Sequence, residues 1–131
     1  VVCPAMGYRT VDAGAVEPEP DRPSECRKLG GPAGLEAMAI NRFHVEPGED
    51  VPLAYHYHDE QEEAFYVLDG TLWVETPEGT HEVPSDHLFA VDPGSPQRAH
   101  VPADADASAT VLAVGAPAVS GDVHAYDPDE E

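Results

Sequence analysis

Two histidines separated by one residue, His56 and His58, are the residues of this chain best suited to chemistry. Residues two apart in a β-strand leave the same face, so both imidazoles point to one side while Tyr57 points to the other. Neutral imidazole nitrogens are common ligands of divalent metals. The spacing therefore predicts two metal ligands on one strand, with a surface-exposed histidine pair as the alternative.

A carboxylate follows this pair on the next apolar run. In residues 63–68, one face carries Glu63, Phe65 and Val67, and the other carries Ala64, Tyr66 and Leu68. Both faces are largely apolar, so we expect a strand buried on both sides, where a carboxylate must be paired or bound to a metal. Two histidines and one carboxylate suit Fe(II), Mn(II), Ni(II) or Zn(II) and leave other positions open. A turn one residue shorter would give this role to Glu62.

Short strands are the elements that must position these residues. Apolar runs of strand length alternate with turn residues, at 38–45, 51–58, 63–68, 71–75, 80–83, 88–91, 97–101 and 109–114. The chain has 14 Pro and 11 Gly, and no helical periodicity lasts longer than a turn or two. This pattern predicts an all-β fold, an antiparallel sandwich or barrel of jelly-roll type.

The 131 residues have room for one domain. Residues 1–35 are rich in Pro and Gly and predict an extended leader that packs along the barrel or stays mobile. Residues 36–118 form the expected barrel and residues 119–131 an acidic tail. Cys3 and Cys26 form no CxxC pair and predict neither a disulfide framework nor a thiolate zinc site.

The spacing around His56 resembles the first motif of the cupin superfamily, G-x5-H-x-H-x3-4-E-x6-G. His56, His58, Glu63 and Gly70 fit this motif, whereas Gly48 is separated from His56 by seven residues where the motif has five. The resemblance implies a cupin double-stranded β-helix, a jelly-roll barrel, with the extended N-terminal leader attached. It also implies that His56, His58 and Glu63 bind one divalent transition metal, Fe, Mn, Ni or Zn.

The second cupin motif, G-x5-P-x-G-x2-H-x3-N, is more eroded, although Gly94 is kept. Asp86 replaces its first Gly, Asp92 its Pro, Val101 its Asn and Gln97 its metal-binding His. The amide oxygen of Gln97 is expected as a fourth ligand; the alternatives are a hydrogen bond to metal-bound water or a polar lining residue of a site that has lost its metal.

The remaining histidines are not expected to bind the metal. His100 lies three residues after Gln97 and faces the opposite side of the strand, so it could replace Gln97 only through a bulge. The histidines at turns, in hairpin strands or near the tail are expected to be solvated or hydrogen-bonded: His44, His81, His87 and His124.

Three functions are compatible with the resemblance. A metal-dependent enzyme of dioxygenase or isomerase type would act on a small molecule inside the barrel. A non-catalytic module would bind a small ligand or a metal, and a structural scaffold would only dimerise. No general base or nucleophile stands out beyond the ligands, so the enzyme and the binding module are about equally expected. The resemblance also implies a homodimer.

The charge balance restricts the partners and the environment. The chain has 26 Asp and Glu against 6 Lys and Arg, a formal net charge of -20, so nucleic acid would be repelled. The acids are interleaved with apolar runs, and Lys28 is the only lysine, which resembles the acidic surface of proteins from salt-accumulating halophiles. An ordinary acidic protein is the alternative. We find no membrane span or secretory signal pattern and expect a cytoplasmic protein.

Overall fold

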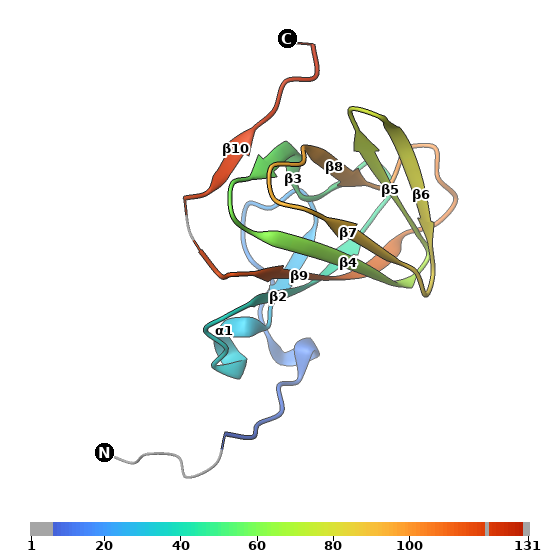
Figure 1. Cartoon of the computed structure of the whole chain (residues 1–131). Coiled ribbons are helices and arrows are strands. Elements are labelled where there is room, and N and C mark those ends of the chain that lie inside the picture. The colour runs from blue at the N-terminus through green and yellow to red at the C-terminus, as the bar shows by residue number, and fades with distance from the viewer. Residues whose placement is uncertain (1–6, 120, 130–131) are drawn as a thin grey trace.

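The computed structural model describes residues 7–119 and 121–129, and only the backbone of Pro52 and Leu53. Two antiparallel five-stranded sheets face each other and enclose the core (Figure 1). The first sheet has the order β1 (Glu25–Lys28), β2 (Ala39–Val45), β9 (Ala109–Ala116), β4 (Glu62–Asp69) and β7 (Leu88–Val91). The second has the order β10 (Val123–Ala125), β3 (Asp50–His58), β8 (Gln97–His100), β5 (Thr71–Thr76) and β6 (Gly79–Pro84).

The all-β jelly-roll prediction is confirmed, and the eight expected strands correspond to β2 to β9. The expected leader contributes a 3-10 turn (Ala13–Ala15), strand β1 and the one-turn helix α1 (Gly30–Ala33), and the expected tail contributes β10. Residues 1–6 of the expected leader, with Cys3, and residues 120, 130 and 131 of the expected tail lie outside the described residues. No helix in the described part of the chain is long and apolar enough to span a membrane.

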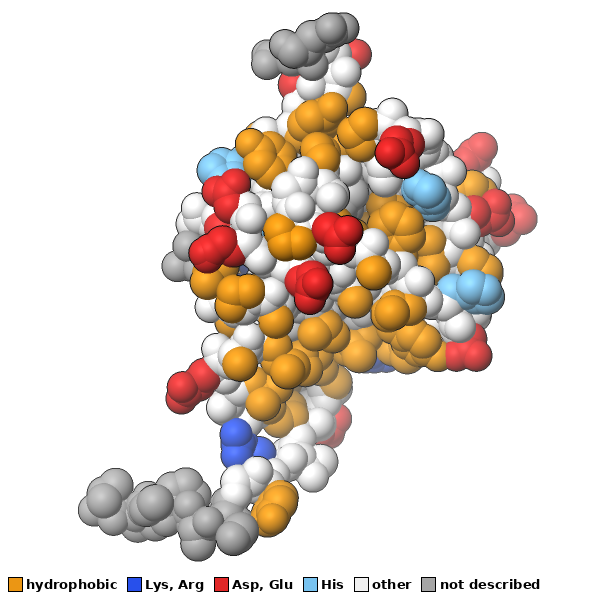
Figure 2. All heavy atoms as spheres, viewed as in Figure 1, with side chains coloured by type: hydrophobic (Ala, Val, Ile, Leu, Met, Phe, Trp, Pro, Cys, Tyr) orange, Lys and Arg blue, Asp and Glu red, His pale blue; other side chains and the backbone are white. Residues whose placement is uncertain are grey.

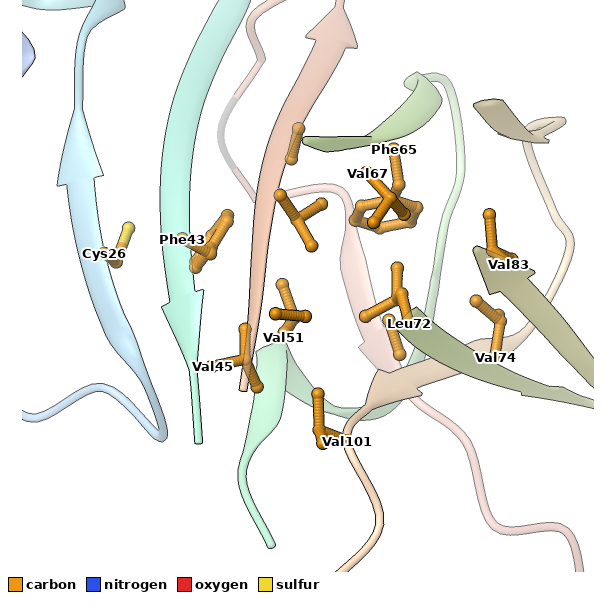
Figure 3. Packing of buried hydrophobic residues seen from close by; sticks show 14 of the residues in the cluster. Cys26, Phe43, Val45, Val51, Phe65, Val67, Leu72, Val74, Val83 and Val101 are labelled. Atoms are coloured by element: carbon orange, nitrogen blue, oxygen red, sulfur yellow. The ribbon is translucent and has the colours of Figure 1, made fainter. Parts of the chain in front are cut away.

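The core consists of the inward-facing side chains of both sheets, as Figure 3 shows. Alternate residues of β4 and β9 are buried, as expected for strands with one face on a core. The largest fully buried apolar side chains are Phe43, Val45, Val51, Phe65, Val67, Leu72, Val74, Val101 and Val111. Cys26 is also buried, because β1 pairs with β2 and places Cys26 opposite Phe43.

The expectation that β4 is buried on both sides is wrong. Its inward residues are buried, but Leu68 is 48% exposed and Tyr66 only half-buried, because the described chain places no layer over the outside of the first sheet. The outward side chains there form what we call the outer apolar face, comprising Ile40, Ala64, Tyr66, Leu88, Ala90, Leu112 and Val114. Figure 2 shows apolar side chains gathered where β4, β7 and β9 lie in Figure 1.

The strand register brings distant residues to one end of the barrel, which we call the site end. In the first sheet, Glu63 pairs with both Val91 and Gly115. In the second sheet, His56 pairs with Gln97. The loop between β7 and β8 is tied to the same place, because the amide of Gly94 donates a hydrogen bond of 2.6 Å to the carbonyl oxygen of His58.

A register shift in β3 accommodates the long spacing between Gly48 and His56. Val51 pairs with Ala99 and His56 pairs with Gln97, so five residue steps along β3 oppose two steps along β8. The extra residues form an irregularity of the bulge type within β3. Pairing between β3 and β8 resumes at His56, so this residue lies beside Gln97.

Gly70 of the first motif occupies a turn that no other residue fits. Its φ is +79°, and a Cβ there would lie 2.4 Å from the carbonyl oxygen of Ser108 and 2.9 Å from the Cα of Ala109. Both contacts are with backbone, which cannot move aside as a flexible side chain does. Gly94 has nearly the same φ, +78°, but no atom within 4 Å of such a Cβ.

We predict that Gly70→Ala lowers the free energy of unfolding by about 2–5 kcal/mol, because the left-handed backbone costs about 1–2 kcal/mol and the overlap adds about 1–3 kcal/mol. Gly94→Ala is the matched control and carries only the backbone cost. Urea denaturation followed by circular dichroism measures both variants. Equal losses for the two variants would show that the contact with Ser108 and Ala109 is unimportant.

Candidate metal centre

The structure brings His56, His58 and Glu63 together at the site end. One possible ligand atom from each residue lies within 4.8 Å of the others. The two histidines leave the end of β3 on the same face, and their ring centroids are 5.1 Å apart. Glu63 is the second residue of β4, lies on its inward face and is 9% exposed, whereas Glu62 is exposed on the outward face. The cluster therefore contains the carboxylate of Glu63 and not that of Glu62.

Hydrogen bonds fix the tautomer of both histidines. The Nδ1 of His56 lies 2.7 Å from the carbonyl oxygen of Ala54, and the Nδ1 of His58 lies 3.0 Å from the Oδ1 of Asp122. Both partners are acceptors, so each Nδ1 carries a proton, and in the neutral ring the Nε2 presents a lone pair. Both Nε2 atoms are buried and make no hydrogen bond in the described structure. This is the arrangement that metal-binding histidines adopt.

Gln97 completes the cluster from β8, which neighbours the strand of the two histidines and lies in the sheet opposite Glu63. Its side chain is 1% exposed, and its Nε2 donates a hydrogen bond of 3.3 Å to the Oε1 of Glu63. This bond leaves the Oε1 of Gln97 buried and without a hydrogen-bond partner among the described residues. His100 lies on the other face of β8, where it pairs with Asp50 and Trp73 in the neighbouring strands. The bulge is in β3, so Gln97 and not His100 faces the site.

Burial is the largest cause of the pKa shifts of His56 and Glu63. It lowers the pKa of His56, whose hydrogen bond to Ala54 and proximity to His58 act less strongly. It raises the pKa of Glu63, while His58 and the hydrogen bond from Gln97 act in the opposite direction. The Nε2 of His58 lies 3.5 Å from the Oε1 of Glu63. The pocket thus disfavours charge on its own groups, and a cation bound among them would stabilise the carboxylate.

Asp122 is a site residue that sequence reasoning missed. It precedes β10 and accepts hydrogen bonds from the Nδ1 of His58 and from the backbone amides of Glu60 and Gln61, the latter two at 3.1 Å. The hydrogen bond from His58 is the largest cause of a lowered pKa at Asp122. One carboxylate therefore orients His58 and also holds the turn that separates His58 from Glu63.

The other histidines lie outside the cluster. His44 contacts Glu46 at 2.9 Å and His124 contacts Asp59 at 2.6 Å, both near the surface. His87 hydrogen-bonds the carbonyl oxygen of Ser85, and the ring of His81 lies against Phe89. Among the described residues, the one group of His, Cys, Asp and Glu side chains close enough to share a metal is His56, His58 and Glu63.

Besides a cavity of about 330 Å³ that reaches Glu63 from the side of Ala64 and Val114, two cavities flank the cluster at the site end. One, of about 360 Å³, lies between the β5–β6 hairpin and the β7–β8 loop and reaches Gln97. The other, of about 400 Å³, lies between the leader and the start of β10 and reaches His58 and Glu63. Both volumes fall in the range of small-molecule sites. A ligand in either cavity would be adjacent to the cluster.

Comparison with solved structures supports the fold. The chain resembles a sugar phosphate isomerase of the cupin superfamily from Silicibacter pomeroyi, with 28% identity, a TM-score of 0.69, and coverage of 82% of this chain and 75% of that chain. It also resembles the polyketide cyclase RemF from Streptomyces resistomycificus, with 23% identity, a TM-score of 0.76, and coverage of 92% and 86%.

A third structure, from Acidithiobacillus ferrooxidans and assigned as a sugar phosphate isomerase, has 23% identity and a TM-score of 0.64. This alignment covers 71% of the chain but only 58% of that protein, so the chain spans less than two thirds of that protein's length. The comparison with curated proteins returned no match.

The family model for the cupin domain matches residues 41–115, from the second strand of the first sheet to the end of β9. The matched range includes all four residues of the cluster and the turn at Gly70. With its paired antiparallel sheets, the chain belongs to the cupin family.

Proposed function

We propose that this protein binds one divalent transition metal through the Nε2 atoms of His56 and His58, a carboxylate oxygen of Glu63 and the Oε1 of Gln97. The supporting observation concerns three atoms around Glu63: the Nε2 of His56, the Nε2 of His58 and the Oε1 of Gln97. All three are buried and have no hydrogen-bond partner in the described structure. Buried polar atoms without partners are costly, so three of them around one carboxylate fit a cation. Imidazole, carboxylate and amide ligands suit Fe, Mn, Ni or Zn.

We propose further that the protein is a metal-dependent enzyme acting on a small molecule. A bound metal would act as a Lewis acid that polarises an oxygen of the substrate, which suits chemistry of the isomerase or dioxygenase type. The protein's own residues orient the ligands, exclude bulk water and leave two cavities for the substrate. The similarity to the Silicibacter pomeroyi sugar phosphate isomerase supports the isomerase type.

A non-catalytic module that binds a metal or a small ligand is the second candidate. It would use the same cluster and cavities, and the buried atoms without hydrogen-bond partners in the described structure support it equally. A structural scaffold without a working site is less well supported, because side chains do not fill the two cavities beside the cluster.

We predict that protein purified in high salt without chelator carries about one divalent metal per chain, and that His56→Ala combined with His58→Ala removes it. The matched control is His44→Ala combined with His87→Ala, which also deletes two imidazoles but lies outside the cluster. Elemental analysis by mass spectrometry measures both. Equal metal content in the two double variants would contradict the site.

We predict that Asp122→Asn weakens metal binding about 10–100-fold, because the amide cannot accept from His58 and from two backbone amides as the carboxylate does. Asp59→Asn removes the same charge from a nearby surface carboxylate and should leave the affinity unchanged. Competition with a chromogenic chelator gives both affinities. If Asp59→Asn weakens binding as much as Asp122→Asn, general charge and not orientation of His58 explains the effect.

We also propose that the protein forms a homodimer and is a cytoplasmic, salt-adapted protein. The outer apolar face supports association with a second copy, because Leu88 on it is 62% exposed. The net charge of -20 supports adaptation to salt, since like charges at the surface repel each other unless they are screened. At molar ionic strength the Debye length falls to about 3 Å.

From the charge we predict that the protein is a folded dimer in molar KCl and loses its structure when KCl is lowered to millimolar concentrations. Sedimentation and circular dichroism melts across a KCl series measure this. Choline chloride at equal ionic strength should substitute for KCl if screening is the cause. A melting curve unchanged between the two limits would refute the salt adaptation.

A further inference from the structure

The two cavities at the site end differ in charge. The cavity that reaches Gln97 is lined by the acids Glu78 and Asp92 and by no Lys or Arg. The cavity that reaches His58 is lined by Arg22 and Lys28, and its only acid is the site residue Glu63. The chain has just 6 Lys and Arg against 26 acids, so two cations at one cavity are a marked local reversal of charge.

Two other arginines form ion pairs with acidic side chains in the described structure. Arg98 pairs with Asp50 and Glu75, and Arg27 pairs with Glu25. Arg22, by contrast, is half-buried and has no hydrogen bond or ion pair to any described residue, and Lys28 has only a contact of 3.6 Å with Glu19. Arg22 therefore lines the cavity with its guanidinium unpaired among the described residues.

Apolar side chains occupy the rest of this cavity. Of the seven large apolar side chains exposed in the described structure, four line it: Leu35, Met38, Val119 and Val123. Exposed apolar groups that gather at a concave surface mark a binding site. The cavity thus offers cations, an apolar wall, and the metal cluster through His58 and Glu63.

We propose that this cavity binds a small organic anion. Its carboxylate or phosphate group pairs with Arg22 and Lys28, because a guanidinium and an ammonium beside an apolar wall form strong charge-assisted hydrogen bonds with such groups. Its apolar body lies against Met38 and Val119. As the substrate class of the metal site, this proposal rests on the proposed function, since the ligand extends toward His58 and Glu63.

The test is calorimetric titration at constant ionic strength with benzoate, its neutral counterpart benzamide, phenyl phosphate and inorganic phosphate. The unmodified protein, Arg22→Gln combined with Lys28→Gln, and Arg42→Gln are compared, each as purified and after treatment with chelator. Arg42 is exposed on β2 and does not line the cavity, so it controls for loss of charge. Metal content and circular dichroism are recorded for every sample.

We expect benzoate or phenyl phosphate to bind more tightly than benzamide, and the double variant to lose about tenfold or more in affinity with unchanged metal content and fold. Arg42→Gln should bind as the unmodified protein does. The better of the two aromatic anions identifies the preferred group, and weaker binding of inorganic phosphate supports the apolar wall.

The proposal is overturned if benzamide binds as tightly as both anions, if Arg42→Gln loses as much affinity as the double variant, or if no probe binds. Binding that depends on Arg22 and Lys28 in a chain that holds no metal supports the anion site and refutes the metal-dependent function. Metal binding without any effect of the double variant refutes the anion site alone.

Discussion

A carboxylate buried inside the barrel is the constraint on which the site depends. Glu63 is 9% exposed, and its contacts with side chains are a long hydrogen bond from Gln97 and the nearby ring of His58. An ionised carboxylate in such a place costs several kcal/mol unless it is compensated. A cation among Glu63, two bare imidazole nitrogens and one amide oxygen would compensate all four groups at once.

The fold supplies this geometry through strand register. The cluster draws on the end of β3, the start of β4 and the start of β8, which lie in two different sheets. The irregularity within β3 restores the pairing of His56 with Gln97, and Gly94 ties the β7–β8 loop to His58. Strands and hydrogen-bonded turns hold side chains more precisely than free loops do, so the fold itself holds the four side chains of the cluster in place.

Local spacing predicted His56, His58 and Glu63, because a two-residue period fixes which side chains share a face. Gln97 was found only by alignment to a motif. No sequence pattern pointed to Asp122 as a site residue. It lies 64 residues from His58, and it is one of several acids in an acidic tail. Strands β1 and β10 were missed because they are short and partly polar, and pairing with an existing edge stabilises them. The outer face of β4 was wrongly expected to be buried, because apolar composition does not reveal whether another layer covers it.

Charge is distributed unevenly around this site, with cations beside the cavity that reaches His58 and acids over most of the chain. The most direct test for a metal at the cluster is anomalous X-ray scattering from crystals grown in high salt without chelator. Metal binding by the cluster predicts one peak about 2.0–2.1 Å from the Nε2 of both His56 and His58, with Glu63 and Gln97 as the other ligands. A site filled only by water, with Glu63 bonded to it, would show that the cluster does not bind a metal.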